Sequence, residues 1–106
     1  MQGKKHTSHI NVTHMFSPGI FQVKCLTNGR SFFGQAEMLL PEMEKFYRRL
    51  EDGICESREL LADVQKYGIA DFEFIIIYFY VSNEEERKCL LEEEKNKWPR
   101  HLLYLN

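Results

Sequence analysis

The chain of 106 residues has only three cysteines, and no apolar run of it reaches the length of a membrane span. An odd number of cysteines (Cys25, Cys55, Cys89) without a Cys-x-x-Cys pair argues against a disulfide framework, a disulfide-linked partner and a zinc site. A membrane-spanning helix needs at least 18 consecutive apolar residues. The first residues include Lys4 and Lys5 where a signal peptide has an apolar core. These absences predict one small domain inside the cell.

Charge is unevenly distributed along the chain, although the net charge is only −2. Residues 1–50 contain seven Lys and Arg against three acids, and residues 51–106 contain seven against thirteen. A dedicated DNA-binding domain is usually basic throughout. The basic half can still form a patch that faces phosphates. The alternative is an ordinary solvated charge pattern, because charge asymmetry alone identifies no partner.

Residues 1–17 are polar and contain no acid. Their composition predicts a basic N-terminal arm, carrying Lys4 and Lys5, that becomes ordered on a partner. The three histidines of this arm (His6, His9, His14) have irregular spacing and no carboxylate nearby, so we expect no metal site there.

A β-hairpin is the clearest local prediction. Asn28-Gly29 separates the apolar runs Gly19–Val23 and Ser31–Gln35. Asn-Gly favours a type I′ turn, because both central residues of that turn need a positive φ. The predicted antiparallel pair carries Phe21 on its first strand and Phe32 on its second.

Three helices and one further strand are predicted beyond the hairpin. Apolar residues recur at helical spacing from Leu39 to Leu50, with Pro41 in the first turn and Gly53 after the end. The next helix begins after Ser57 as N-cap and ends at Gly68.

Residues 72–81 lack polar side chains after Glu73 and predict a strand covered on both faces. Ser82 and Glu85 form a capping box for a last helix that ends before Pro99. A short apolar tail, Leu102–Leu105, follows. The predicted fold is α+β, with a small three-stranded antiparallel sheet flanked by helices in the order β-β-α-α-β-α.

Several motifs in this order resemble the GIY-YIG nuclease family. They are Gly19-Ile20-Phe21 and Phe32-Phe33-Gly34 on the hairpin, the stretch from Gln65 to Phe74, and the stretch from Leu90 to Lys95. The resemblance covers residues 18–98. It implies the same small sheet flanked by helices, with the polar arm (1–17) and a C-terminal tail (99–106) outside it.

The residues at the family's catalytic positions differ in chemistry. The two signature tyrosines fall on Phe21 and Phe32, the helix arginine on Glu42, and a frequent histidine on Phe46. Phenylalanine neither exchanges a proton nor donates a hydrogen bond. Each lost group typically costs about 2–4 kcal/mol of transition-state stabilisation, so the sequence predicts a pseudoenzyme that needs no cofactor.

Glu94 aligns with the metal-binding glutamate of the family. Its spacing from Leu91 and Trp98 places it within the apolar stripe of the last helix. A carboxylate that faces a core is paired, protonated or bound to a cation, and hard divalent cations favour oxygen ligands. The alternatives are a metal ligand and a glutamate at the edge of the stripe that reaches water.

Two functions follow from these observations. The first is an inactive GIY-YIG-like domain that binds DNA or RNA or serves as a subunit of a larger protein or ribonucleoprotein assembly, docked through its termini. The alternative is a weakly active DNA endonuclease that uses Glu94 with Mg²⁺ or Mn²⁺. Either fits the cytoplasm, an organelle interior or a phage-infected cell. The predicted nucleic-acid-binding residues are Lys4, Lys5, Lys24, Arg30, Lys45, Arg48 and Arg49.

Overall fold

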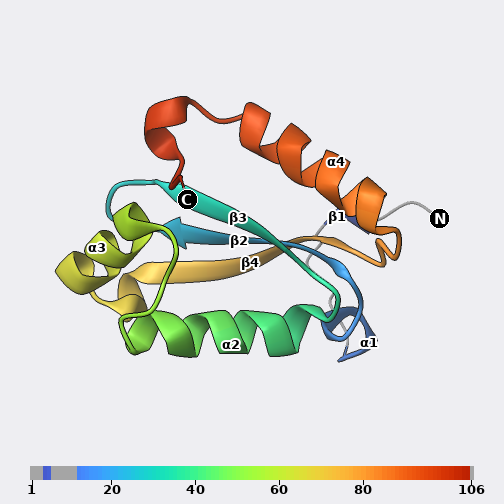
Figure 1. Cartoon of the computed structure of the whole chain (residues 1–106), viewed down its shortest axis with the longest axis horizontal. Coiled ribbons are helices and arrows are strands. Elements are labelled where there is room, and N and C mark those ends of the chain that lie inside the picture. Colours follow the sequence, from blue (N-terminus) through green and yellow to red (C-terminus); the bar gives the residue numbers. More distant parts are fainter. Residues whose placement is uncertain (1–3, 6–11, 106) are drawn as a thin grey trace.

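In the computed structural model, a curved antiparallel sheet lies between helices on both faces (Figure 1). The structure describes residues 4–5 and 12–105, with side chains from Thr13 onward. The elements are β1 (Lys4–Lys5), α1 (Val12–Met15), β2 (Gly19–Cys25), β3 (Ser31–Ala36), α2 (Leu39–Glu51), α3 (Arg58–Tyr67), η1 (Ile69–Asp71), β4 (Phe72–Phe79), α4 (Glu84–Asn96) and η2 (Arg100–Leu102).

The sheet confirms the predicted fold class and adds one short strand. Its order is β1-β4-β2-β3, and β2, β3 and β4 are the three predicted strands in the predicted order β-β-α-α-β-α. The addition is β1, whose two residues pair with Phe79 and Tyr78 of β4. Helices α2 and α3 cover one face and α4 covers the other, while β3 forms the edge between them (Figure 1).

The hairpin is confirmed, but the predicted type I′ turn is wrong. The nitrogen of Cys25 donates to the oxygen of Arg30, and the nitrogen of Gly29 donates to the oxygen of Cys25. These bonds enclose a four-residue loop in which only Gly29 has a positive φ, of 76°. The loop is anchored to the distant Asp71, whose backbone oxygen and carboxylate accept hydrogen bonds from the nitrogens of Leu26 and Thr27. This long-range anchor favours the wider turn.

Most of the predicted helix ends are confirmed. The Ser57 hydroxyl accepts from the nitrogen of Leu60 at the start of α3, and Gly68 follows its end with φ 89°. The predicted capping box of α4 is wrong by one residue. There the Asn83 side chain is the N-cap and accepts from the nitrogen of Glu86 at 2.9 Å.

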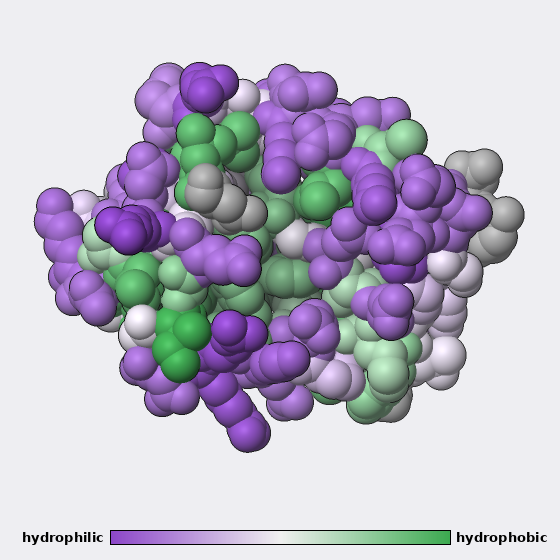
Figure 2. Space-filling view, in the orientation of Figure 1, coloured by the Kyte–Doolittle hydropathy of each residue, from purple (hydrophilic) through white to green (hydrophobic). Residues whose placement is uncertain are grey.

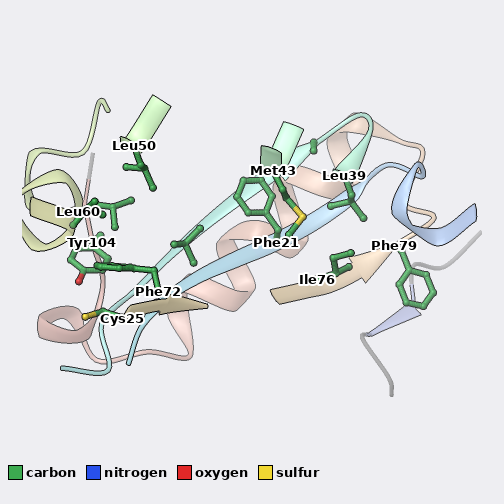
Figure 3. Packing of buried hydrophobic residues seen from close by; sticks show 13 residues of the cluster. Phe21, Cys25, Leu39, Met43, Leu50, Leu60, Phe72, Ile76, Phe79 and Tyr104 are labelled. Atoms are coloured by element: carbon green, nitrogen blue, oxygen red, sulfur yellow. The ribbon is translucent and has the colours of Figure 1, made fainter. Parts of the chain in front are cut away.

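Apolar side chains fill both faces of the sheet, as the pattern of β4 predicts. The larger cluster joins β2 and β4 to α2 and α3 through residues such as Phe21, Met43, Leu60 and Phe72 (Figure 3). The smaller cluster lies under α4 around Ile20, Phe33 and Ile77. A one-residue slip of a strand would therefore move its side chains to the opposite face and disrupt both clusters.

Both ends of the described chain contact the domain. Near the N-terminus, the His14 ring stacks on Phe79 at 4.3 Å. Near the C-terminus, Tyr104 is only 4% exposed and donates to the Asp63 carboxylate at 2.6 Å. The guanidinium of Arg30 lies over the Tyr104 ring, 4.4 Å from its centre. These contacts count against docking through the C-terminal tail and the end of the arm, while residues 1–3 and 6–11 of the predicted arm lie outside the described part of the chain.

We expect Tyr104→Ala to lower the free energy of unfolding by about 3–5 kcal/mol, because it leaves a cavity beside Phe72 and Leu60. The neighbouring Leu105 is 42% exposed, so Leu105→Ala should change stability by less than about 0.5 kcal/mol. Urea denaturation of the two variants measures the difference. Equal effects would contradict the integration of the tail into the core.

Candidate functional site

A groove of about 270 Å³ opens at the edge formed by β3, between α2 and α4. Figure 2 shows this region as an apolar hollow between two more polar rims, in the same orientation as Figure 1. Four separate elements (β2, β3, α2 and α4) contribute lining residues, so the groove exists only in the folded chain. The residues that line it are Phe21, Phe32, Phe33, Gly34, Gln35, Glu42, Lys45, Phe46, Arg49, Leu91 and Lys95.

Phenylalanine rings form the floor of the groove. In the β2–β3 register, Phe21 pairs with Gly34 and Phe32 with Val23, which directs both rings to the face covered by α2. There Phe46 stacks on Phe32, with ring centroids 5.0 Å apart and planes inclined by 15°. Phe46 also meets Phe21 edge to face at 5.9 Å. The absence of a side chain at Gly34 is required, because a Cβ there would lie 2.7 Å from the Phe21 ring.

Basic side chains stand on both walls of the groove. Lys45 and Arg49 lie one turn apart on α2, and Lys95 faces them from α4. Lys95 also approaches Glu92, 3.6 Å away, in an exposed pair that contributes little stability. Among the described residues, Glu42 is the only acidic side chain that lines this groove. The rim therefore has a net positive charge.

A buried arginine orients the amide of Gln35 at the groove wall. Arg87 is 5% exposed, and its Nε donates to Gln35 Oε1 at 3.2 Å. Its Nη1 donates to the backbone oxygens of Val81 and Ser82. Since arginine has only donors, the oxygen of the Gln35 amide must face Arg87. The amide NH₂ of Gln35, a residue that lines the groove, makes no hydrogen bond within the described residues.

Glu94 is buried, as its place in the apolar stripe predicts, but it does not line the groove. It is 5% exposed, and Oε2 accepts from Lys97 Nζ at 2.8 Å. The Glu94 hydrogen bond and charge raise the pKa of Lys97. Burial and the Glu94 charge raise the pKa of Tyr78. Pairing with Lys97 thus accounts for the buried carboxylate, and the role of Glu94 as a metal ligand stays a prediction.

The remaining predicted binding residues are dispersed. Arg30 is engaged internally, with Nη2 2.7 Å from Glu59 and 3.2 Å from the backbone oxygen of Leu103. Lys24 pairs within the sheet with Ser31 and Glu73, outside the groove. Arg48 is exposed on α2 and lines neighbouring hollows.

Lys4 and Lys5 lie in β1, at the sheet edge opposite β3, and their side chains are outside the described part. Of the seven predicted basic residues, the groove therefore brings together Lys45 and Arg49.

Two solved structures resemble this arrangement. The catalytic domain of homing endonuclease I-TevI is 27% identical, with a TM-score of 0.59, and the match covers 81% of this chain and 88% of that chain. A variant of the catalytic domain of intron endonuclease I-TevI is 28% identical, with a TM-score of 0.57 and coverage of 80% and 82%. The chain is a GIY-YIG nuclease-like domain. No protein-family model and no curated protein matches it.

The four residues that the sequence resemblance predicts at the family's catalytic positions, Phe21, Phe32, Glu42 and Phe46, all line this groove. None of the described residues that line the groove carries a hydroxyl or an imidazole, the groups that most often transfer protons or stabilise an oxyanion. A divalent cation fits poorly here, because one carboxylate stands among three cations. Across the described residues, no group of three or more His, Cys, Asp or Glu could hold a metal ion.

Sequence reasoning missed Gln35, Leu91 and Lys95 as groove residues. Leu91 and Lys95 are one turn apart on α4, so their spacing indicated that they share a helix face. Nothing in the local sequence indicated that this face meets β3.

The described cysteines are free, and no helix within residues 4–5 and 12–105 is long and apolar enough to cross a membrane.

We expect Glu94→Gln to lower the pKa of Tyr78, because it removes the negative charge that disfavours the phenolate. Ultraviolet difference titration, with Tyr78→Phe in both backgrounds to assign the signal, measures this shift. Burial still holds the pKa of Tyr78 above its usual value in the variant. An unchanged titration would contradict the placement of Glu94 beside Tyr78.

Proposed function

We propose that the chain is a catalytically inactive GIY-YIG-like domain that binds nucleic acid through the groove between α2 and α4. One observation carries the proposal: phenylalanine rings form the floor of the groove, at the positions that the sequence resemblance assigns to the family's reactive groups, while cations stand on both walls. Both similar structures are endonuclease domains, and the substrate of an endonuclease is nucleic acid. The groove thus has the features of a binding surface and lacks those of a reaction centre.

Inactivity follows from the chemistry of phosphodiester hydrolysis. The reaction needs an activated water, stabilisation of added negative charge and a path for the leaving oxygen. Phe21, Phe32 and Phe46 contribute no proton donor or acceptor. Glu42 adds negative charge where the phosphate would carry more. The alternative of a weak metal-dependent endonuclease would need Glu94, which is paired with Lys97 outside the groove.

The cationic side chains on the walls of the groove support nucleic-acid binding. Lys45, Arg49 and Lys95 are positioned to face the phosphates of a strand in the groove, and such contacts release counterions from the nucleic acid. A place in a larger protein or ribonucleoprotein assembly is the other form of the hypothesis. It predicted docking through the termini, whose described residues pack on the domain itself. The contacts therefore favour nucleic-acid binding.

We expect the double variant Lys45→Ala/Arg49→Ala to bind nucleic acid more weakly than the unaltered chain. The slope of log affinity against log salt should become shallower by about 1–2, because two phosphate contacts are lost. Lys66→Ala/Lys88→Ala removes the same charge from exposed positions outside the groove and serves as the control. Fluorescence anisotropy across a salt series measures both. Equal loss in the two double variants would mean that only net charge matters.

We expect no nicking of plasmid DNA above background with Mg²⁺ or Mn²⁺, and no effect of Glu94→Ala on that background. Reintroducing polar groups by Phe21→Tyr, Phe32→Tyr and Glu42→Arg together tests whether the groove retains the shape for catalysis. The assay compares all three proteins at equal concentration. Nicking by the unaltered chain that Glu94→Ala abolishes would overturn the proposal and establish the endonuclease.

A further inference from the structure

We infer that the groove takes a single strand and that an unpaired base of this strand stacks on a platform formed by Phe32 and Phe46. This inference rests on the proposed function and specifies its ligand. It depends on three features of the described residues: the access to the Phe32 ring, the path of the cations, and the oriented amide of Gln35.

The platform is accessible from several sides. Phe32 lines the groove and also two adjoining hollows of about 210 and 100 Å³. Phe46 lines the groove and the larger hollow, and Phe33 lines the groove and the smaller one. Both platform rings are half-buried, so they retain surface for a ligand. Aromatic side chains on which bases stack are the usual basis of single-strand binding.

The platform is also rigid. Phe21 meets Phe46 edge to face at 5.9 Å, and Phe74 meets it from β4 at 6.4 Å. Phe32 is fixed by the β2–β3 register, which pairs it with Val23. A base that stacks here therefore meets rings that lose little freedom on binding, which favours affinity.

Cationic side chains also line the groove and the two hollows that adjoin it. Arg49 lines the groove and the hollow near Cys55, and Lys95 lines the groove and the hollow near Tyr104. A positive side chain thus stands at each junction, on opposite walls. A backbone that runs through the three hollows meets a cation on either side of the platform, which is the arrangement that single-strand channels use.

Gln35 supplies a directed hydrogen-bond donor. Because Arg87 holds the amide oxygen, the NH₂ group is the part left for a ligand in the groove. Base edges carry carbonyl and ring-nitrogen acceptors that such a donor can meet. In a duplex, each base is paired and covered by its neighbours, so it reaches the platform only after costly unstacking. These features together favour single strands.

The inference is tested with fluorescent single strands, the matching duplex, and a single strand with one abasic site. We expect the unaltered chain to bind the intact single strand at least fivefold more tightly than the duplex. Loss of the stacked base should weaken single-strand binding by about fivefold to a hundredfold. Because the abasic strand probes the unaltered protein, this arm does not depend on how any variant folds.

Variants locate the stacked base. Phe32→Leu keeps an apolar side chain but removes the ring. It should lower the affinity for the intact single strand about as much as the abasic site lowers the affinity of the unaltered chain. Phe16→Leu removes a ring that is 46% exposed and does not line the groove, and it serves as the control. Gln35→Met should lower the affinity for the intact single strand by about two- to tenfold and leave the affinity for the abasic strand unchanged.

The outcomes separate this inference from the proposed function. Equal affinity for single strand, duplex and abasic strand, with unchanged binding by Phe32→Leu, would overturn the inference while leaving the proposed function intact. Failure to bind any of these nucleic acids at low salt would overturn both. The platform is supported if the tighter binding of single strands is lost both with the abasic strand and in Phe32→Leu, but is kept in Phe16→Leu.

Discussion

The contact of Phe46 with Phe21 and Phe32 is the interaction on which the site depends. The β2–β3 register directs the two strand rings to one face, and α2 places the third ring upon them. This apolar contact closes the core beneath the groove and also forms its floor. Helix α2 thereby holds Lys45 and Arg49 at the groove wall. A change in these rings would alter the core and the ligand surface together.

A fold can persist after its reactive groups are replaced, because the two depend on different atoms. Tyrosine and phenylalanine share the ring that packs between strand and helix, and they differ only in the hydroxyl. The I-TevI catalytic domain and this chain accordingly share a fold at 27% identity. In this chain the groove combines an apolar floor with cationic side chains on both walls. The energetic consequence is that affinity can remain where stabilisation of a transition state is lost.

Local sequence signals predicted the elements well, whereas long-range contacts set what they missed. Ser57 and Gly68 lie at the two ends of α3, and each favours a helix end by its own side chain or backbone freedom. The sequence alone therefore predicted where this helix begins and ends. The hairpin turn differs because Asp71, distant in sequence, binds the loop. Tyr104 joins the core through Asp63 and Arg30, which no local pattern indicates. At the site, the rings were predictable, but the groove-facing side of α4 and the Arg87–Gln35 pair were not.

Amide chemical-shift mapping by NMR tests the central claim most directly, since it shows where a ligand lies and whether a cation binds. Titration with a single-stranded oligonucleotide should move the amides of residues 32–35 and 45–49, and the strand should remain intact. Mg²⁺ alone should leave the amides around Glu94 unmoved. Selective shifts around Glu94 with Mg²⁺, together with cleavage of the oligonucleotide, would contradict the account.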